Sequence, residues 1–479
     1  MQTNHNEAEI FSDYLVSGKI PVKTELKTQS EKKFCDLFHS CKKFINERKI
    51  ESKNNDKWLI ELLLVIKNRL GFIFYELEDE AIVYTVFEVL NSRGLEVNWL
   101  DKTKSVLMGI VYEKSVSNLS LKETISSLQN YWGKIYHVLG LKELNGDEIL
   151  TYASTLMSPE DSIKAKLVNL QDSLDLFKSL SNSDVGNALK IARMILRVAN
   201  NYKKLSSISE YQFFYSISQC RFLYISLMLN DILQDEDKQE ILIHWEKVSF
   251  RIYGLMGNDS KKKLGDYIKL GREIYYNNIK NPFNQKVKID DYNKFNGLSL
   301  KDKIIHRIQE IGKESAIEIA IDRLKEKNCY MNWDMELKYF FYKYEQYISD
   351  KKNASYNDNI WTSIFNSPST KSIEHIVPQN DPRNLWADVI DRSQDNYELQ
   401  INRIGNLLIL PPNLNSRCST KDFSGKKVIY KEALSHVVND VIYDSYIPNG
   451  DAVEKTDWSM TQIEHRENKL INAALEIWS

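Results

Sequence analysis

The chain has 479 residues, enough for about two to four domains at roughly 100–200 residues per domain. Hydrophobic residues make up 42% and aromatic residues 11%, a composition that excludes a globally disordered chain. The 64 basic residues are balanced by 66 acidic ones, for a net charge of -2. This balance excludes a uniformly polycationic nucleic-acid binder, so any contact with DNA must come from a local basic patch.

The cysteines and the apolar runs bear on the cellular location of the protein. The five cysteines include no Cys-x-x-Cys pair, which argues against a disulfide scaffold and a cysteine-based zinc site, and fits a reducing cytosol. The N-terminus has no apolar signal core, and the strongest apolar run, 58–66, is far shorter than the ~20 residues of a membrane span. We expect a cytoplasmic protein with no membrane partner.

The first 115 residues predict helices around one strand. A helix is expected near Phe34–Phe44, and the alternating aromatic run 70–76 predicts a strand. Apolar residues at helical spacing follow in 82–90, and 91–94 has the composition of a turn. Asp101 then falls in the first turn of another helix, where a carboxylate suits the helix dipole.

Residues 116–330 show an almost wholly helical pattern. One apolar stripe among many consists of Ile191, Met194, Ile195 and Val198. A helical bundle is the simplest interpretation, and 284–300 resembles a polar connecting segment. Another helix is expected from Trp333 to Tyr347, followed by a polar loop near 351–359.

Candidate chemistry begins with a short apolar run that contains Glu374 and His375 and ends at Pro378. Neighbouring side chains on a strand point to opposite faces, so both serve one site only if the strand ends there, which the proline favours. An isolated Glu-His pair is more often structural than catalytic.

Two further segments follow in a fixed order. Gly405 and Asn406 predict a turn before the apolar strand 407–410, and this strand would pair with the first as a hairpin with a wide loop. Asn406 can hold that loop by bonding backbone groups, although an ordinary turn asparagine is the default when it stands alone. After two prolines, a helical stretch carries Asn415, and residues 400–431 contain six basic residues and one acidic residue, a local charge of +5.

Together these segments resemble an HNH (ββα-metal) nuclease, in which a hairpin and a helix enclose one divalent ion. Asn406 and Asn415 are nine residues apart, as in that pattern. The resemblance implies that His375 is the general base for water and that Asn406 orients the histidine or its loop. It also implies that Glu374 and Asn415 bind Mg²⁺ or Mn²⁺ through oxygen ligands. The residues expected to hold DNA phosphates are Arg417, Lys426 and Lys427.

More specifically, the motifs resemble the C-terminal domain of GmrSD-type modification-dependent (type IV) restriction endonucleases. That family places an acidic residue before His-Ile-x-Pro-Gln, then Gly-Asn-Leu, Leu-Asn and Lys-Lys, as at 374–379, 405–407, 414–415 and 426–427 here. A lead-in helix at 337–345 and a closing helix in the tail extend the similarity over about 330–479. Asn402 stands where the family has a histidine-like position, and Glu374 replaces the commoner aspartate.

A second resemblance covers 86–95 with Asp101 and Lys104, which is similar to the end of the family's ParB-like N-terminal domain. The Asp-Gly-Gln-Gln-Arg motif with which that domain usually begins does not occur. A fragment, a companion protein that supplies the motif, and a diverged form remain open. No nucleotide binding is therefore predicted.

We thus expect a mainly α fold, a large helical body with a small ββα-metal core near the C-terminus. The predicted domains are 1–115 (partial ParB-like), 116–330 (helical, suited to substrate choice or regulation) and 331–479 (nuclease). The predicted function is metal-dependent cleavage of DNA, modified phage DNA by resemblance, in antiviral restriction. An inactive remnant that binds DNA or a partner protein and a stand-alone HNH toxin are the alternatives; a homodimer would explain double-strand breaks, although no interface pattern is found.

Overall fold

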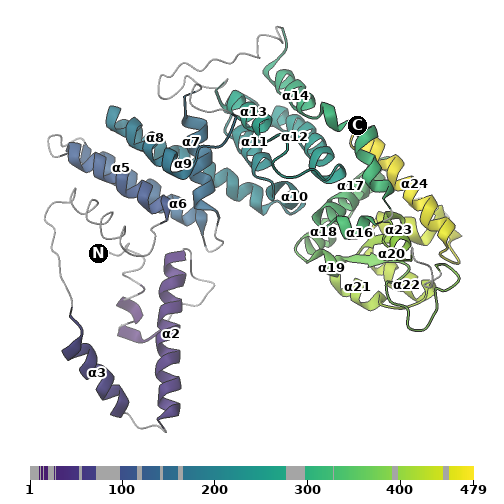
Figure 1. The fold of residues 1–479 in the computed structure, drawn as a ribbon, viewed down its shortest axis with the longest axis horizontal. Coiled ribbons are helices and arrows are strands. Elements are labelled where there is room, and N and C mark those ends of the chain that lie inside the picture. Colours follow the sequence, from purple (N-terminus) through teal and green to yellow (C-terminus); the bar gives the residue numbers. More distant parts are fainter. Residues whose placement is uncertain are drawn as a thin grey trace. The chain divides into compact units, whose positions relative to one another are not determined.

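The structure is a computed structural model that forms two compact units (Figure 1). It describes residues 10, 12–14, 16–19, 26, 29–52, 57–71, 98–115, 121–140, 144–159, 165–276, 297–326, 328–390, 397–445 and 453–479. The first unit comprises 1–163, 167–203 and 281–286, and the second comprises 164–166, 204–280 and 287–479. The three-domain division proposed from the sequence stays a prediction.

The described residues of the first unit form helices and connecting segments, with no strand among them. Its helices are α2 (Gln29–Glu51), α3 (Lys57–Arg69), α5 (Trp99–Ser115), α6 (Leu121–Leu139), α7 (Gly146–Met157), α8 (Leu170–Ser183) and most of α9 (Gly186–Ser207). The helix expected near Phe34–Phe44 and the place of Asp101 in the first turn of α5 are confirmed. So is the stripe of α9, whose four members are buried. The strand expected at 70–76, apart from its first two residues, the helix at 82–90 and the turn at 91–94 lie outside the described residues.

The second unit contains the remaining elements. Its helices are α10 (Gln212–Tyr215), α11 (Ser218–Met228), α12 (Asp235–Ser249), α13 (Leu264–Tyr276), α14 (Leu300–Ile311), α15 (Ile317–Ala320), α16 (Cys329–Asn332), α17 (Met335–Lys351), α18 (Asp358–Phe365), α19 (Ser369–Ser372), α20 (Tyr397–Ile401), α21 (Pro412–Cys418), α22 (Phe423–Tyr430), α23 (His436–Ile442) and α24 (Met460–Ile477). Short 3₁₀ turns are η2 (Ser209–Tyr211), η5 (Lys313–Ser315), η6 (Ile321–Lys325), η7 (Ile404–Asn406) and η8 (Lys431–Ala433), and η3 (Phe250–Leu255) is a π-helical turn.

Strands are few and short among the described residues. β1 (Ile373–His375) pairs antiparallel with β2 (Leu407–Ile409), with Glu374 opposite Leu408. β3 (Tyr443–Ser445) pairs with β4 (Val453–Glu454). The predictions of a mainly α fold and of a hairpin joining the two motif segments are therefore confirmed. None of the described helices has the length and apolar character needed to span a bilayer.

Two long helices, α17 and α24 (Met460–Ile477), pack together next to the hairpin. α17, predicted to start at Trp333, starts at Met335 and packs against α23 and α24, which Figure 1 shows beside it. The aromatic rings of Phe340 and Trp478 stack at 5.2 Å between centroids, joining α17 to the end of α24. Glu345 of α17 is buried and accepts hydrogen bonds of 2.8 Å from the backbone nitrogens of His436 and Val437. A carboxylate at this helix start satisfies donors that the helix itself leaves unpaired, so it fixes the start of α23 to α17, and α23 also packs against β2.

The turn before β2 is held against α24 at van der Waals range. A Cβ added to Gly405 would lie 2.1 Å from the backbone oxygen of Ile463, so no side chain fits there. The buried guanidinium of Arg466 donates to Gly405 O at 2.9 Å and to Leu407 O at 2.5 Å. Arg403, next to this turn, binds Glu467 of α24 through Nε at 2.9 Å and Nη2 at 2.8 Å. These contacts fix where β2 begins.

Gly405→Ala is expected to lower the free energy of unfolding by about 1–3 kcal/mol, because backbone atoms must move to admit the methyl group. The matched control is Gly133→Ala within α6, where nothing lies within 4 Å of the added Cβ and stability should rise by up to about 1 kcal/mol. Chemical denaturation measures both variants. Equal stability of Gly405→Ala and the wild type would show that the turn does not lie against α24.

Candidate active site

β1 directs the two motif residues to opposite faces of the hairpin. Glu374 contacts Lys426 and Tyr430 of α22, whereas His375 contacts Asn402 and the ring of Tyr330. Both side chains are buried, with 5% and 7% of their surface exposed. The alternation expected from the strand is thus present, and each residue has its own environment.

The imidazole of His375 lies in a polar and aromatic enclosure. Its Nε2 is 3.1 Å from Oδ1 of Asn402, and the Tyr330 ring meets it edge to face at 4.5 Å between centroids. Burial lowers the pKa of His375 to about 4; the hydrogen bond that the ring makes to the Asn402 oxygen acts against this shift, and the charge of Lys426 acts with it. The ring is therefore neutral at pH 7, the form that accepts a proton.

Lys426 is fully buried beside the carboxylate of Glu374. Its ammonium donates to Glu374 Oε1 at 2.6 Å, to His375 O at 2.7 Å and to Ile376 O at 3.0 Å, which uses its three protons. The structure does not place Lys426 where a DNA phosphate would reach it, contrary to its expected role. Burial raises the pKa of Glu374, opposed by Lys426 and by the Tyr430 hydroxyl, which donates to Oε1 at 3.1 Å.

The carboxamide of Asn415 lies at the outer edge of β1. Its Nδ2 donates to Lys371 O at 2.9 Å and to Ile373 O at 3.2 Å. Lys426 binds the next carbonyls of the same segment, so side chains from α21 and α22 satisfy the edge that β2 does not cover. Asn415 and Lys426 are thus brought to the same strand as Glu374 and His375.

Asn406 is fully buried and holds the backbone rather than the imidazole. Its Oδ1 accepts from Val377 N at 2.8 Å, and its Nδ2 donates to Val377 O at 3.1 Å and to Ile401 O at 2.8 Å. It therefore acts on the segment immediately after His375, the second of the two roles that the sequence left open.

The comparison with protein families bears on the same segment. Residues 314–473 match the family described as GmrSD restriction endonucleases, C-terminal domain. This part of the chain is similar to the C-terminal domain of that family. The resemblance inferred from the motifs is confirmed, and the matched range begins at 314, before the expected start of the resemblance near 330, and ends at 473. Residues 86–104 lie outside the match, so the ParB-like resemblance stays a prediction, and the search of curated proteins gave no match.

A metal site in the GmrSD domain has to be judged from its donor atoms. The described residues contain no group of three or more His, Cys, Asp and Glu side chains suited to a metal ion. Within those residues, however, Oε2 of Glu374 and Oδ1 of Asn415 accept no hydrogen bond, while the other polar atoms of these side chains are engaged. Carboxylate and amide oxygens are ligands that hard divalent cations take, with water in the remaining positions. The donor chemistry fits such an ion.

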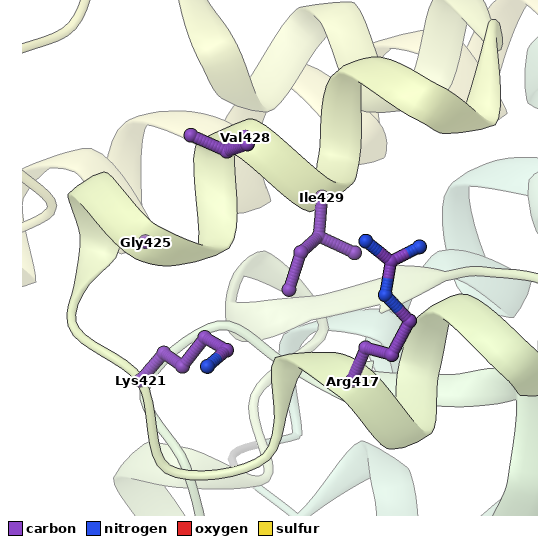
Figure 2. A pocket seen from close by; sticks show the side chains of 5 residues that line it. All are labelled: Arg417, Lys421, Gly425, Val428 and Ile429. Carbon is purple, nitrogen blue, oxygen red and sulfur yellow. The ribbon is translucent and has the colours of Figure 1, made fainter.

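The basic residues of α21 and α22 differ in how exposed their side chains are and in the groups that they bind. Arg417 is exposed and pairs with both carboxylate oxygens of Glu432, at 2.6 and 2.7 Å, whereas Lys427 is half-buried and donates to Lys455 O at 2.6 Å. Figure 2 shows Arg417 and Ile429 directed into an open pocket between the two helices. Its lining residues are Arg417, Lys421, Gly425, Val428 and Ile429. A cationic, partly apolar surface of this kind suits a nucleic-acid strand.

Two residues beside His375 were not found from the sequence. Asn328 and Tyr330 precede α17, well before the motif, and the spacing of the motif gives no indication of them. Asn402 was noted only as a departure from the family pattern. All three lie inside the matched GmrSD range.

Lys426→Met is expected to destabilise the domain by about 3–5 kcal/mol, because it leaves the Glu374 carboxylate buried without its cation and two carbonyls without a donor. The control is Lys421→Met, an exposed lysine close by, for which a change within about 0.5 kcal/mol is expected. Urea denaturation compares the two. Similar losses would show that the buried ammonium is not a structural element of the hairpin.

Proposed function

We propose that the chain is a metal-dependent DNA endonuclease of a restriction system, with His375 as the general base. The family match itself indicates a nuclease of the restriction-endonuclease type, for which DNA is the substrate. The observation that carries the finer proposal is the geometry of His375 at the end of β1: Nε2 of its imidazole is engaged by Asn402, and burial keeps the ring neutral. The carboxylate of the preceding residue, Glu374, points to the other face of the hairpin and keeps one oxygen free of hydrogen bonds.

The base is assigned to Nδ1 of His375. Nε2 is engaged by Asn402, and among the described residues none hydrogen-bonds Nδ1, which is also not among the buried nitrogens that lack a partner. Nδ1 therefore keeps contact with solvent, and a water at that position can give it a proton while attacking a phosphodiester. Burial keeps the ring unprotonated at pH 7, the form that accepts a proton, and by lowering its pKa also makes it a weaker base than a free imidazole.

The other residues of the site would position the reactants. Asn406 fixes Val377 and thereby the end of β1, and Lys426 holds the carbonyl of His375 itself. Glu374 and Asn415 would hold Mg²⁺ or Mn²⁺ through their free oxygens. When bound, the ion supplies positive charge that stabilises the phosphate and the leaving 3′-oxygen.

The strand of DNA would lie over α21 and α22. The Arg417–Glu432 pair is exposed, and exposed ion pairs add little to stability because water and salt screen them, so a phosphate can replace the carboxylate at little cost. Lys421 offers an exposed ammonium in the same pocket. Lys427 lies on α22 as well, but its ammonium pairs with Glu454 at 3.6 Å, so a phosphate would have to compete with that carboxylate. Modified phage DNA as the substrate is taken from the family resemblance, and a cytoplasmic place of action is taken from the cysteine pattern and the N-terminal composition.

His375→Ala is expected to reduce the cleavage rate by about 10²–10⁴-fold, the usual contribution of a general base, while DNA binding and thermal stability are retained. The control is His465→Ala, an exposed histidine of α24 in the same domain, which should cleave at the wild-type rate. Unmodified and phage-modified DNA are incubated with Mg²⁺ or Mn²⁺, with and without a chelator, and the products are separated on gels.

Three results would contradict this assignment. Full cleavage by His375→Ala would show that another residue is the base. Cleavage in the presence of the chelator would show that the reaction does not depend on a divalent metal ion. A wild-type chain that binds DNA but cuts neither substrate would favour the alternative, a binding protein derived from a nuclease.

A further inference from the structure

His375 is the first member of a chain of three polar side chains that cross from β1 to α16. The imidazole is hydrogen-bonded to the carboxamide of Asn402, and that carboxamide is in turn hydrogen-bonded to the carboxamide of Asn328. We propose that Asn402 and Asn328 form a relay that fixes His375 in the tautomer with its proton on Nε2, so that the lone pair lies on Nδ1. The tautomer itself follows from the contacts, and only its role in catalysis rests on the proposed function.

The direction of the Asn402 carboxamide follows from its second contact. Its Nδ2 donates to Oδ1 of Asn328 at 3.2 Å, so the atom directed at the imidazole, 3.1 Å from Nε2, is the oxygen. An amide oxygen only accepts hydrogen bonds. Nε2 must therefore carry the proton, and a neutral imidazole then has its acceptor nitrogen at Nδ1.

The backbone holds Asn402 in place for this contact. Asn402 is buried, with 4% of its surface exposed, and its N donates to Glu398 O at 3.2 Å. Its carbonyl accepts from Tyr330 N at 3.1 Å, which ties it to the segment that carries Asn328. The ring of the same tyrosine contacts the imidazole, so α16 supplies one wall of the enclosure and the residue directly before it, Asn328, is the end of the relay.

Asn328 matters because a carboxamide has two nearly equal orientations. Without an acceptor at Asn328, the Asn402 side chain can turn over and present Nδ2 to the ring. That orientation favours the tautomer with its proton on Nδ1, which has no lone pair for the water. In enzymes with the base held in the wrong tautomer, the rate falls on the order of 10⁴-fold. Asn328 and Asn402 are therefore positioning residues.

The experiment reads the tautomer directly, in the full chain labelled with ¹⁵N-histidine at neutral pH. Long-range proton–nitrogen NMR distinguishes a protonated from an unprotonated ring nitrogen, and the His375 signals are those missing from His375→Gln among the eight histidines. Wild type should show a proton on Nε2. Asn402→Leu and Asn328→Leu should populate the other tautomer, whereas Asn402→Asp and Asn328→Asp, which keep an accepting oxygen, should retain it.

Kinetics provide the second readout. The leucine variants should lose kcat with an unchanged KM for DNA, and Asn328→Asp should recover it, a rescue that a purely structural role would not give. The control is Asn413→Ala, an exposed asparagine of α21, with wild-type tautomer and rate.

A proton on Nδ1 in the wild type overturns the relay, even if the leucine variants do not fold. Folded leucine variants that keep the proton on Nε2 overturn it as well. Failure of the proposed function looks different, because the chain would then show the expected tautomers in every variant and cleave no DNA.

Discussion

Lys426 places a fully buried ammonium between the Glu374 carboxylate and the two carbonyls at the end of β1. Transfer of an ammonium from water to a protein interior costs several kcal/mol, so it persists there only with a carboxylate and a complete set of acceptors. Here the set is complete. The same contact neutralises Glu374, closes the open edge of a two-stranded sheet and adds positive charge near His375.

A three-residue strand pair has little stability of its own, so its geometry must come from its surroundings. α21 and α22 supply the side chains at the outer edge, and α24 supplies Arg466 and Glu467 at the turn before β2. α23, fixed by Glu345, covers the other strand. The candidate site is therefore a small hairpin inside a rigid frame of helices, as a general base that must keep a fixed orientation requires.

Much of this frame could be predicted from local sequence. The hairpin follows from two apolar segments with a turn and a proline, and the stretch after the next two prolines indicates the helix that carries Asn415. The burial of Lys426 could not be predicted, because a lysine within a basic run has the pattern of a solvated face and its partner lies 52 residues away. Asn328 could not be predicted either, since its contact with Asn402 spans 74 residues and depends on how α16 packs.

Asn406 joins two positions that stand at opposite ends of the segment between the strands, Val377 and Ile401. Three hydrogen bonds from one carboxamide therefore close this loop at its base, whatever lies in between. Because the loop is closed at its base, a change in its length need not move the imidazole. The entropic cost of closing a longer loop also grows only with the logarithm of its length. The loop between β1 and β2 can therefore accept insertions, including a new recognition element, without a shift of the strand ends.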